Sequence, residues 1–386
     1  MNLIFLMFLG FMLLLSLRLR GFYSPSSLML AVWFLEFVAQ YYFGFYVIEL
    51  KTEMLLAIFI TSFVIGAFIG SSIKFKKSNY EWSENKIYNA IKLIFMLLVI
   101  VAPFLYLDIR NNVGFDVNNI AQSVRRYYVY SFSAGGTPIT IKILANFSII
   151  LVVLVCICSK IKLHKKLIFF MCGLLGVTAT FSKGYFLLML CYILSLKIFQ
   201  NKRRYLYLMV AICSAFVFLT LYNVVRDRID MDKYFRIYLL SSLPAFQLIV
   251  NGDFHFPFPT LFGFMKPVYE SMGMNVDIQI GNNFVEVPDY TNVFTAFGPA
   301  LSNYGYVFTI FYFMINGFIS GIVFNLAKSN YIIFKILYGF ILFAIVTSVF
   351  SDAFALWNTI FNYLLVFSLI NWYARKKINN SNLTVI

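Results

Sequence analysis

The sequence predicts an all-α integral membrane protein with about 11 transmembrane helices and two long loops on one side of the membrane. Two observations define this fold class. Of the 386 residues, 61% are hydrophobic and 20% aromatic, and the mean hydropathy of +0.82 exceeds that of soluble domains. Apolar runs long enough to cross a bilayer also recur along the chain, with lysine and arginine gathered in alternate connections.

The predicted spans follow from the length of these apolar runs. A helix that crosses the hydrocarbon core needs about 20 largely apolar residues, and shorter runs suffice where polar ends help. Eleven segments qualify, at approximately 2–17, 27–48, 54–73, 87–107, 139–159, 167–181, 184–200, 205–225, 303–326, 331–350 and 355–373. The sixth and seventh are short, and we expect them to be separated at Ser182-Lys183-Gly184. Together the spans predict a single polytopic membrane domain over residues 1–386.

Basic residues in the short connections orient the spans. Clusters fall at five alternate connections, namely Arg18 with Arg20, Lys74 with Lys76 and Lys77, 160–166, 202–204 and 375–377. Eleven spans then place the N-terminus outside, the C-terminus in the cytoplasm and all five clusters on the cytoplasmic side. Two long segments, 108–138 and 226–302, project to the outer side. Long loops in compact proteins often carry binding or catalytic residues, so we expect the functional site in these two segments.

Arginine is concentrated on the outer side, against the positive-inside rule. The outer arginines are Arg110, Arg125, Arg126, Arg226, Arg228 and Arg236. A guanidinium group binds phosphate oxygens bidentately and stays charged at any working pH, so this pattern favours a substrate that carries a diphosphate. The formal charge of +15 does not indicate nucleic-acid binding, because membrane proteins retain lysine at the cytoplasmic ends of their spans.

The stretch RDRIDMDKYFR at 226–236 has two other interpretations. On a helix, Arg226 with Asp230 and Arg228 with Asp232 are i,i+4 pairs, typical of an exposed salt-bridge ladder. Asp230-Met231-Asp232 also has the D-x-D form of a divalent-metal site. The adjacent basic residues compete for those carboxylates, and a metal with oxygen ligands needs several acids or waters, so we expect neither metal nor cofactor.

A carboxylate or imidazole of the second outer segment is the expected general base, because it must reach the hydroxyl whose proton it removes. We predict Asp230, Asp232 and His255 as catalytic residues, with Asp253 and Glu270 as alternatives. A plain loop histidine is the other interpretation of His255.

Three further features have structural interpretations. Glu36 lies in the second span, so we expect it to face the interior of the bundle or a water cavity. The five cysteines lie in apolar runs without metal-ligand spacing and are expected to be packing residues. Tyr127, Tyr128 and Tyr130 are either interfacial aromatics or platforms that stack on sugar rings.

Three segments resemble the Wzy-type family of bacterial O-antigen and oligosaccharide repeat-unit polymerases. TATFSKGYFLLML is similar to the family's S-R/K-G turn, with Ser182, Lys183 and Gly184 in place. YFRIYLLSSLPAFQ is similar to the segment after the family's arginine-rich region, and TNVFTAFGPALSNYGYVFTIFYFMINGFISG to the stretch that enters the next span. The resemblance runs from about residue 90 to the end. It departs at Asn303, where members often have an acid before the aromatic-glycine pair.

The resemblance implies a GT-C-like polymerase/ligase architecture in the bacterial inner membrane, with the active site facing the periplasm. It implies that the growing O antigen passes from one undecaprenyl diphosphate carrier to the next unit, in lipopolysaccharide biosynthesis. The implied partners are this lipid-linked oligosaccharide, the lipid bilayer, and the chain-length regulator and flippase of the same pathway. Lys183, Arg226, Arg228 and Arg236 would bind the donor diphosphate, and Arg110, Arg125 and Arg126 the acceptor. An O-antigen ligase and a flippase or other transporter of lipid-linked sugars are the alternatives.

Overall fold

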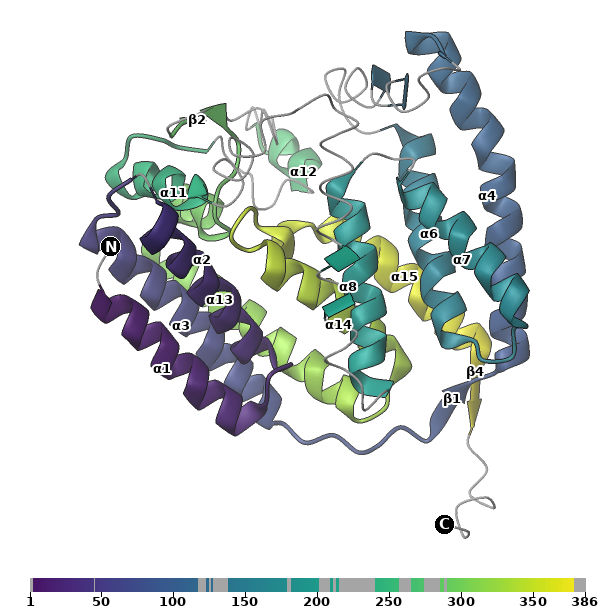
Figure 1. Cartoon of the computed structure of the whole chain (residues 1–386), viewed down its shortest axis with the longest axis horizontal. Helices are drawn as coiled ribbons and strands as arrows, with labels where there is room; N and C mark the ends of the chain where they lie inside the picture. Colours follow the sequence, from purple (N-terminus) through teal and green to yellow (C-terminus); the bar gives the residue numbers. More distant parts are fainter. Residues whose placement is uncertain are drawn as a thin grey trace. The chain divides into compact units, whose positions relative to one another are not determined.

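The chain is an α-helical membrane protein (Figure 1). The computed structural model describes residues 3–44, 46–116, 123–124, 126–127, 138–178, 182–200, 209–210, 213–214, 240–256, 265–273, 285–287 and 290–377. Six helices of this part are long and apolar enough to cross a membrane. They are α1 (Leu3–Arg20), α2 (Pro25–Phe43), α3 (Leu50–Ser72), α4 (Glu84–Val113), α6 (Ile139–Ile157) and α13 (Phe297–Lys328).

Shorter elements complete the described chain. The remaining helices are α7 (Leu163–Thr178), α8 (Lys183–Gln200), α11 (Ser242–Asn251), α12 (Lys266–Ser271), α14 (Ile332–Thr347), the 3-10 turn η4 (Ala353–Ala355) and α15 (Trp357–Ala374). Two antiparallel strand pairs accompany them: β1 (Tyr80–Trp82) with β4 (Arg375–Lys377), and β2 (Val285–Glu286) with β3 (Tyr290–Thr291).

The helices fall where the apolar runs predict spans. Ten of the eleven predicted segments coincide with a described helix, and the eleventh, 205–225, lies mostly outside the described residues, so the count of eleven stays a prediction. α7 and α8 are separate helices, as predicted at Ser182-Lys183-Gly184. α13 begins at Phe297, but its helical geometry is interrupted at Gly305, close to the start predicted for this span at about 303. The turns before Gly305 carry small and polar residues that lower the hydropathy of any window there.

The chain forms two compact units, each assembled from three segments. Unit 1 comprises Met1–Lys76, Asp230–Ser329 and Phe340–Asn362, and unit 2 comprises Lys77–Ile229, Asn330–Gly339 and Tyr363–Ile386.

Unit 1 is built on close contact between α3 and α13, which glycine makes possible. Gly66 and Gly70 of α3 lie against the backbone of Met314 and Phe318, and Gly317 of α13 lies against that of Phe63. A Cβ atom at any of these glycines would overlap a carbonyl oxygen. Residue numbers rise together on the two helices, so α3 and α13 run parallel. Small residues at i,i+4 spacing are what allows helix backbones to approach this closely in membranes.

Aromatic rings fill the interior of unit 1 beside this contact. Phe297, the first residue of α13, is fully buried, with its ring centroid 5.1 Å from Trp33, 5.5 Å from Phe59 and 4.5 Å from Phe313. Aromatic pairs at such distances add to the dispersion energy of a packed core. α2, α3 and α13 are thereby fixed to one another near the start of α13.

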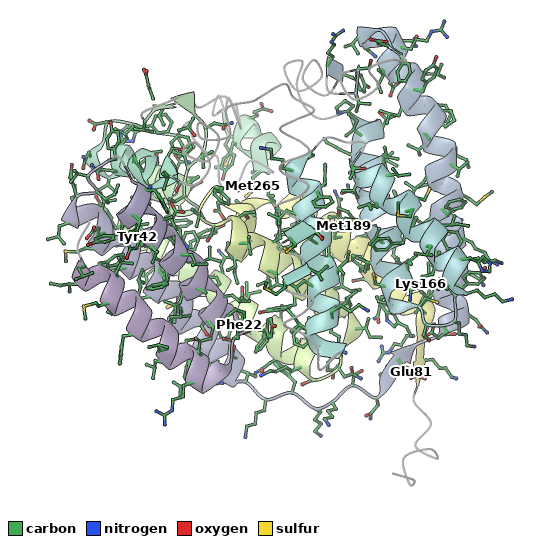
Figure 2. The ribbon with its side chains drawn as sticks, in the orientation of Figure 1. Phe22, Tyr42, Glu81, Lys166, Met189 and Met265 are labelled. Carbon is green, nitrogen blue, oxygen red and sulfur yellow. The ribbon has the colours of Figure 1, made fainter. Side chains whose placement is uncertain are left out.

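The two ends of unit 1 differ in charge. At one end, Arg20 donates to the carbonyl oxygens of Ser71 and Phe68 at 3.3 Å, and Asn325 donates to that of Ile73 at 2.7 Å. The ends of α1, α3 and α13 therefore meet there, and that end carries Arg18, Arg20, Lys74, Lys76 and Lys328. At the opposite end, α11 meets the start of α3. Phe22, just before α2, and Tyr42, near the end of α2, mark these two ends of unit 1 in Figure 2.

Unit 2 also has one strongly basic end. There Glu84 accepts hydrogen bonds from the amide and hydroxyl of Ser159 at 2.9 and 2.8 Å, and the Ser83 amide donates to the Ala374 carbonyl at 2.7 Å. The start of α4 and the ends of α6 and α15 thus lie together, and Glu81 and Lys166 mark this end in Figure 2. Its basic residues are Lys86, Lys160, Lys162, Lys165, Lys166, Arg375, Lys376 and Lys377.

The glycine contact predicts a specific sensitivity to added bulk. Gly317→Ala places a Cβ against the Phe63 carbonyl, and we expect it to lower the free energy of unfolding by on the order of 1–3 kcal/mol, the usual cost of overpacking. Gly10→Ala in α1 is the control, because its nearest neighbour is the ring of Phe34 at 3.4 Å. Thermal unfolding in detergent measures both variants, and equal midpoints would refute the close contact.

Candidate functional site

Most of the predicted site residues lie outside the described part of the chain. These are Asp230, Asp232, Arg125, Arg226, Arg228 and Arg236. Their predicted roles, and the choice between a salt-bridge ladder and a diphosphate site for 226–236, stay predictions.

Four predicted site residues are described. Arg110 is exposed in the last turn of α4, and Arg126 is exposed. Lys183 is half-buried at the first residue of α8, and His255 is exposed just after α11. The backbone N–H groups at the start of a helix favour anions, so the position of Lys183 suits a phosphate group.

A cluster of buried polar side chains in unit 1 was not predicted from the sequence as a site. Glu36 and Gln40 of α2 are one helical turn apart, and both point inward, with exposures of 2% and 6%. Glu36 Oε1 accepts a hydrogen bond from the Ser242 hydroxyl at 3.2 Å, and Gln40 donates to the Leu240 carbonyl. Ser241 in turn donates to Thr291 at 3.2 Å. We call Glu36, Gln40, Ser241, Ser242 and Thr291 the polar cluster.

The local sequence explains why α11 begins at this cluster. Pro244 lies in the first turn of α11, where proline is tolerated because the N–H group it lacks has no partner within the helix. Gly252 ends the helix in the left-handed conformation at φ 82°, a position that favours glycine. α11 is therefore a short helix whose start presents Ser241 and Ser242 to α2.

Glu36 confirms the expectation that a carboxylate in this span faces the interior. Its Oε2 atom is buried and has no hydrogen-bond partner among the residues that the structure describes. A carboxylate in a membrane interior is costly unless it is paired or protonated. Glu36 thus stabilises the start of α11 through one oxygen only.

A second set of contacts fixes the connection between α14 and α15. The Trp33 indole donates to the Ser348 hydroxyl at 3.0 Å, and the Ala296 amide donates to the Ser348 carbonyl at 2.7 Å. Ser348, where this connection begins, therefore lies against α2 and the start of α13. Because its partner Trp33 is one turn from Glu36 on α2, Ser348 lies near the polar cluster.

The same connection carries Asp352, an acid that was not predicted as a site residue. Its Oδ2 atom accepts a hydrogen bond from the Tyr312 hydroxyl at 3.0 Å, and its Oδ1 atom accepts one from the Phe354 amide at 3.0 Å. Burial raises the pKa of Asp352 to about 7, although these hydrogen bonds act to lower it. A carboxyl group with such a pKa exchanges its proton near neutral pH.

An aromatic row on α13 leads from Tyr304, near the start of the helix, to Tyr312. Tyr304 and Phe308 have ring centroids 4.6 Å apart, and Phe308 and Tyr312 are stacked at 6.0 Å. Helical geometry is interrupted at Gly305, whose φ of 76° favours glycine. The row of Tyr304, Phe308 and Tyr312 therefore begins at a break in the helix and ends at the carboxylate of Asp352.

Other predicted details are partly visible. Asp108, two residues before Arg110, accepts a hydrogen bond from Thr140 at 2.9 Å and so ties the end of α4 to the start of α6. Cys158 and Cys191 are buried, as packing residues would be, whereas Cys213 is exposed. In the described residues no three His, Cys, Asp or Glu side chains lie close enough to hold a metal ion together.

Comparison of the chain with known protein families, curated proteins and solved structures gave no match.

The polar cluster predicts which substitutions reduce stability. Gln40→Leu leaves the buried Leu240 carbonyl without its donor, and we expect it to lower the free energy of unfolding by about 1–3 kcal/mol. Gln247→Leu is the matched control, because the amide of Gln247 bonds to Glu49 on the exposed surface, where water can replace it. Thermal unfolding in detergent should show a lower midpoint for Gln40→Leu than for Gln247→Leu. An equal loss of stability in both variants would contradict the importance of the polar cluster.

Proposed function

We propose that this membrane protein polymerises oligosaccharide repeat units carried on undecaprenyl diphosphate, at the outer face of the bacterial inner membrane. The observation that carries the proposal is the group of arginines in the two long segments on the predicted outer side. The positive-inside rule disfavours basic residues on that side, so arginines there are expected to have a function. Binding of a diphosphate substrate is such a function.

The arrangement of basic residues supports this orientation. Each unit has one end rich in lysine and arginine, formed by segments far apart in sequence, and the positive-inside rule assigns such ends to the cytoplasm. Arg110, at the far end of α4, and Lys183, at the start of α8, then belong to the outer side.

The parallel packing of α3 and α13 supports the predicted number of spans. Two parallel spans require an odd number of crossings between them. Between α3 and α13 the described chain contains four long or apolar helices, α4, α6, α7 and α8. The span predicted at 205–225 would be the fifth crossing, and this count agrees with the proposal that 226–302 lies on the outer side.

The contacts in unit 1 support the resemblance to repeat-unit polymerases. Two of the three segments that carry it, 234–247 and 291–321, meet directly through the hydrogen bond from Ser241 to Thr291. The third contains Lys183 and lies in unit 2. Segments that resemble one family and also contact one another in the fold are consistent with a shared role.

The proposed reaction is glycosyl transfer with a diphosphate leaving group. A hydroxyl of the acceptor unit attacks the anomeric carbon of the donor glycan, and the bond from that carbon to the phosphate oxygen breaks. Negative charge grows on that oxygen, so cations fixed around it stabilise the transition state more than the ground state. Lys183, Arg226, Arg228 and Arg236 have this role, and Arg110, Arg125 and Arg126 hold the acceptor. Asp230, Asp232 and His255 are the initial candidates for the base.

The proposal predicts polymer formation by the purified protein alone. Reconstituted with a lipid-linked repeat unit, the chain should produce a ladder of products, and Arg226→Ala or Lys183→Ala should slow it by about 100-fold or more, the scale for losing one group that stabilises the developing charge. Lys142→Ala, an exposed lysine of the same predicted side, is the control and should keep wild-type rates.

Other products would identify the alternatives. Transfer only after addition of lipid A core would indicate a ligase. Movement of single units across the bilayer without ladders would indicate a transporter. Wild-type ladders from both Arg226→Ala and Lys183→Ala would refute the assigned cation site.

The orientation predicts which side chains react from outside the cell membrane. Asp253→Cys, at the α11 end of unit 1, should react with a membrane-impermeant maleimide applied to spheroplasts, because that end faces outward. Lys76→Cys, at the basic end of the same unit, should react only after the membrane is opened. Both native residues are exposed, and the unmodified chain with its five cysteines gives the background. The reverse pattern would place the proposed site in the cytoplasm.

A further inference from the structure

Asp352 combines features that the other described acids of unit 1 lack. Its side chain is half-buried, whereas that of Glu36 is enclosed and that of Asp253 is exposed. A substrate can therefore reach Asp352 while water is partly excluded. It lies in the connection between α14 and α15, which the predicted topology assigns to the outer side. Its two oxygens are held in place by the Tyr312 hydroxyl and the Phe354 amide, both at 3.0 Å.

Among the described residues, aromatic rings pack on Phe354, two positions after Asp352. From α3, Phe63 packs on Phe354 with ring centroids 5.7 Å apart, and from α13, Phe313 packs on the same ring at 6.4 Å. The titratable group that faces Asp352 from the described part of these helices is the Tyr312 hydroxyl. A carboxylate in such a place binds a proton more tightly than one in water.

Resting on the polymerase function proposed above, we propose that Asp352 is the general base that activates the acceptor hydroxyl and that Tyr312 positions it. The Asp352 carboxylate takes the proton of the sugar hydroxyl as that oxygen bonds to the anomeric carbon of the donor. The bond from this carbon to the diphosphate breaks, and its electron pair leaves with undecaprenyl diphosphate. Asp352 then releases the proton to water.

The aromatic row on α13 gives the acceptor a path to this base. Tyr304 and Phe308 are half-buried, and their rings extend the row from Tyr312 back to the break at Gly305. Aromatic faces bind the apolar faces of sugar rings. A sugar that stacks on this row directs its hydroxyl groups toward the end occupied by Asp352.

The decisive experiment compares Asp352→Asn with wild-type chain in the reconstituted ladder assay. Loss of a general base typically slows a reaction by roughly 100- to 10,000-fold, and we expect a loss of that size. Asp230→Asn and Asp232→Asn test the rival bases in the same assay. Glu49→Gln, an exposed acid that bonds to Gln247, is the control and should leave the rate unchanged.

The pH dependence separates catalysis from a structural role. Burial raises the pKa of Asp352 to about 7, so polymerisation should fall as the pH drops below 7 and the base becomes protonated. The hydrogen bond from Tyr312 lowers this pKa, so Tyr312→Phe should raise it and shift the acidic limb of the rate profile to higher pH.

Stability provides a second readout. Because the pKa of the folded carboxyl lies above the ordinary value of 3.8, the folded state binds its proton more tightly than the unfolded state. Stability from this group is therefore present at low pH and is lost as the pH rises toward 7. Asp352→Asn, which carries no charge, should melt at or above the wild-type temperature at pH 8 while its activity is lost.

Each outcome has a distinct meaning. Wild-type rates from Asp352→Asn, or an unchanged pH profile in Tyr312→Phe, overturn the assignment of Asp352. Activity lost only in proportion to folded protein also overturns it. A wild-type chain that makes no polymer refutes the proposed function itself, whereas polymer from wild type and Asp352→Asn alike refutes only the base.

Discussion

The contact between α3 and α13 is the constraint on which the rest of unit 1 depends. Four glycines, Gly66, Gly70, Gly317 and Gly321, let two parallel helices touch through their backbones. Lipid tails are as apolar as leucine, so the hydrophobic effect does not drive helices together in a membrane, and close van der Waals packing must do so. The contact holds the part of α13 after Gly305 against α3, and the ring contacts of Phe297 hold the start of α13 against α2 and α3. The polar cluster and the connection that carries Asp352 are both fixed by hydrogen bonds to this frame.

Two acids of unit 1 show how position decides what a carboxyl group can do. Glu36 is enclosed beneath α11 and bonds to Ser242 through one oxygen, so its contact is with the protein. Asp352 is only half-buried, and a tyrosine and a backbone amide hold it at the end of an aromatic row. Removal of a proton from a sugar requires a base that is reachable, fixed and partly desolvated. Asp352 meets these conditions among the described acids, whereas Glu36 contributes to the packing of α2 against α11.

Hydropathy and charge patterns predicted the helices well because each depends on local composition. The same patterns did not predict the glycine contact, since Gly66 and Gly317 are 251 positions apart by numbering and their match depends on how the helices pair. They also did not reveal the break at Gly305, which depends on a single backbone angle. Asp352 was missed because an acid in a short connection after an apolar run is ordinary in sequence. Only its contact with Tyr312, 40 positions earlier, distinguishes it.

The chemistry proposed for this protein favours separating its cations from its base. A diphosphate leaving group needs arginines close to the breaking bond, but a guanidinium beside a carboxylate lowers the pKa of that carboxylate and weakens it as a base. Asp230 and Asp232 are flanked in sequence by Arg228 and Lys233, so they are suited to orient those cations. Asp352 has Ser351, Ala353 and Phe354 around it and keeps a higher affinity for protons. An enzyme that must stabilise a strongly anionic leaving group and also remove a proton is therefore expected to take its base from a different segment than its arginines.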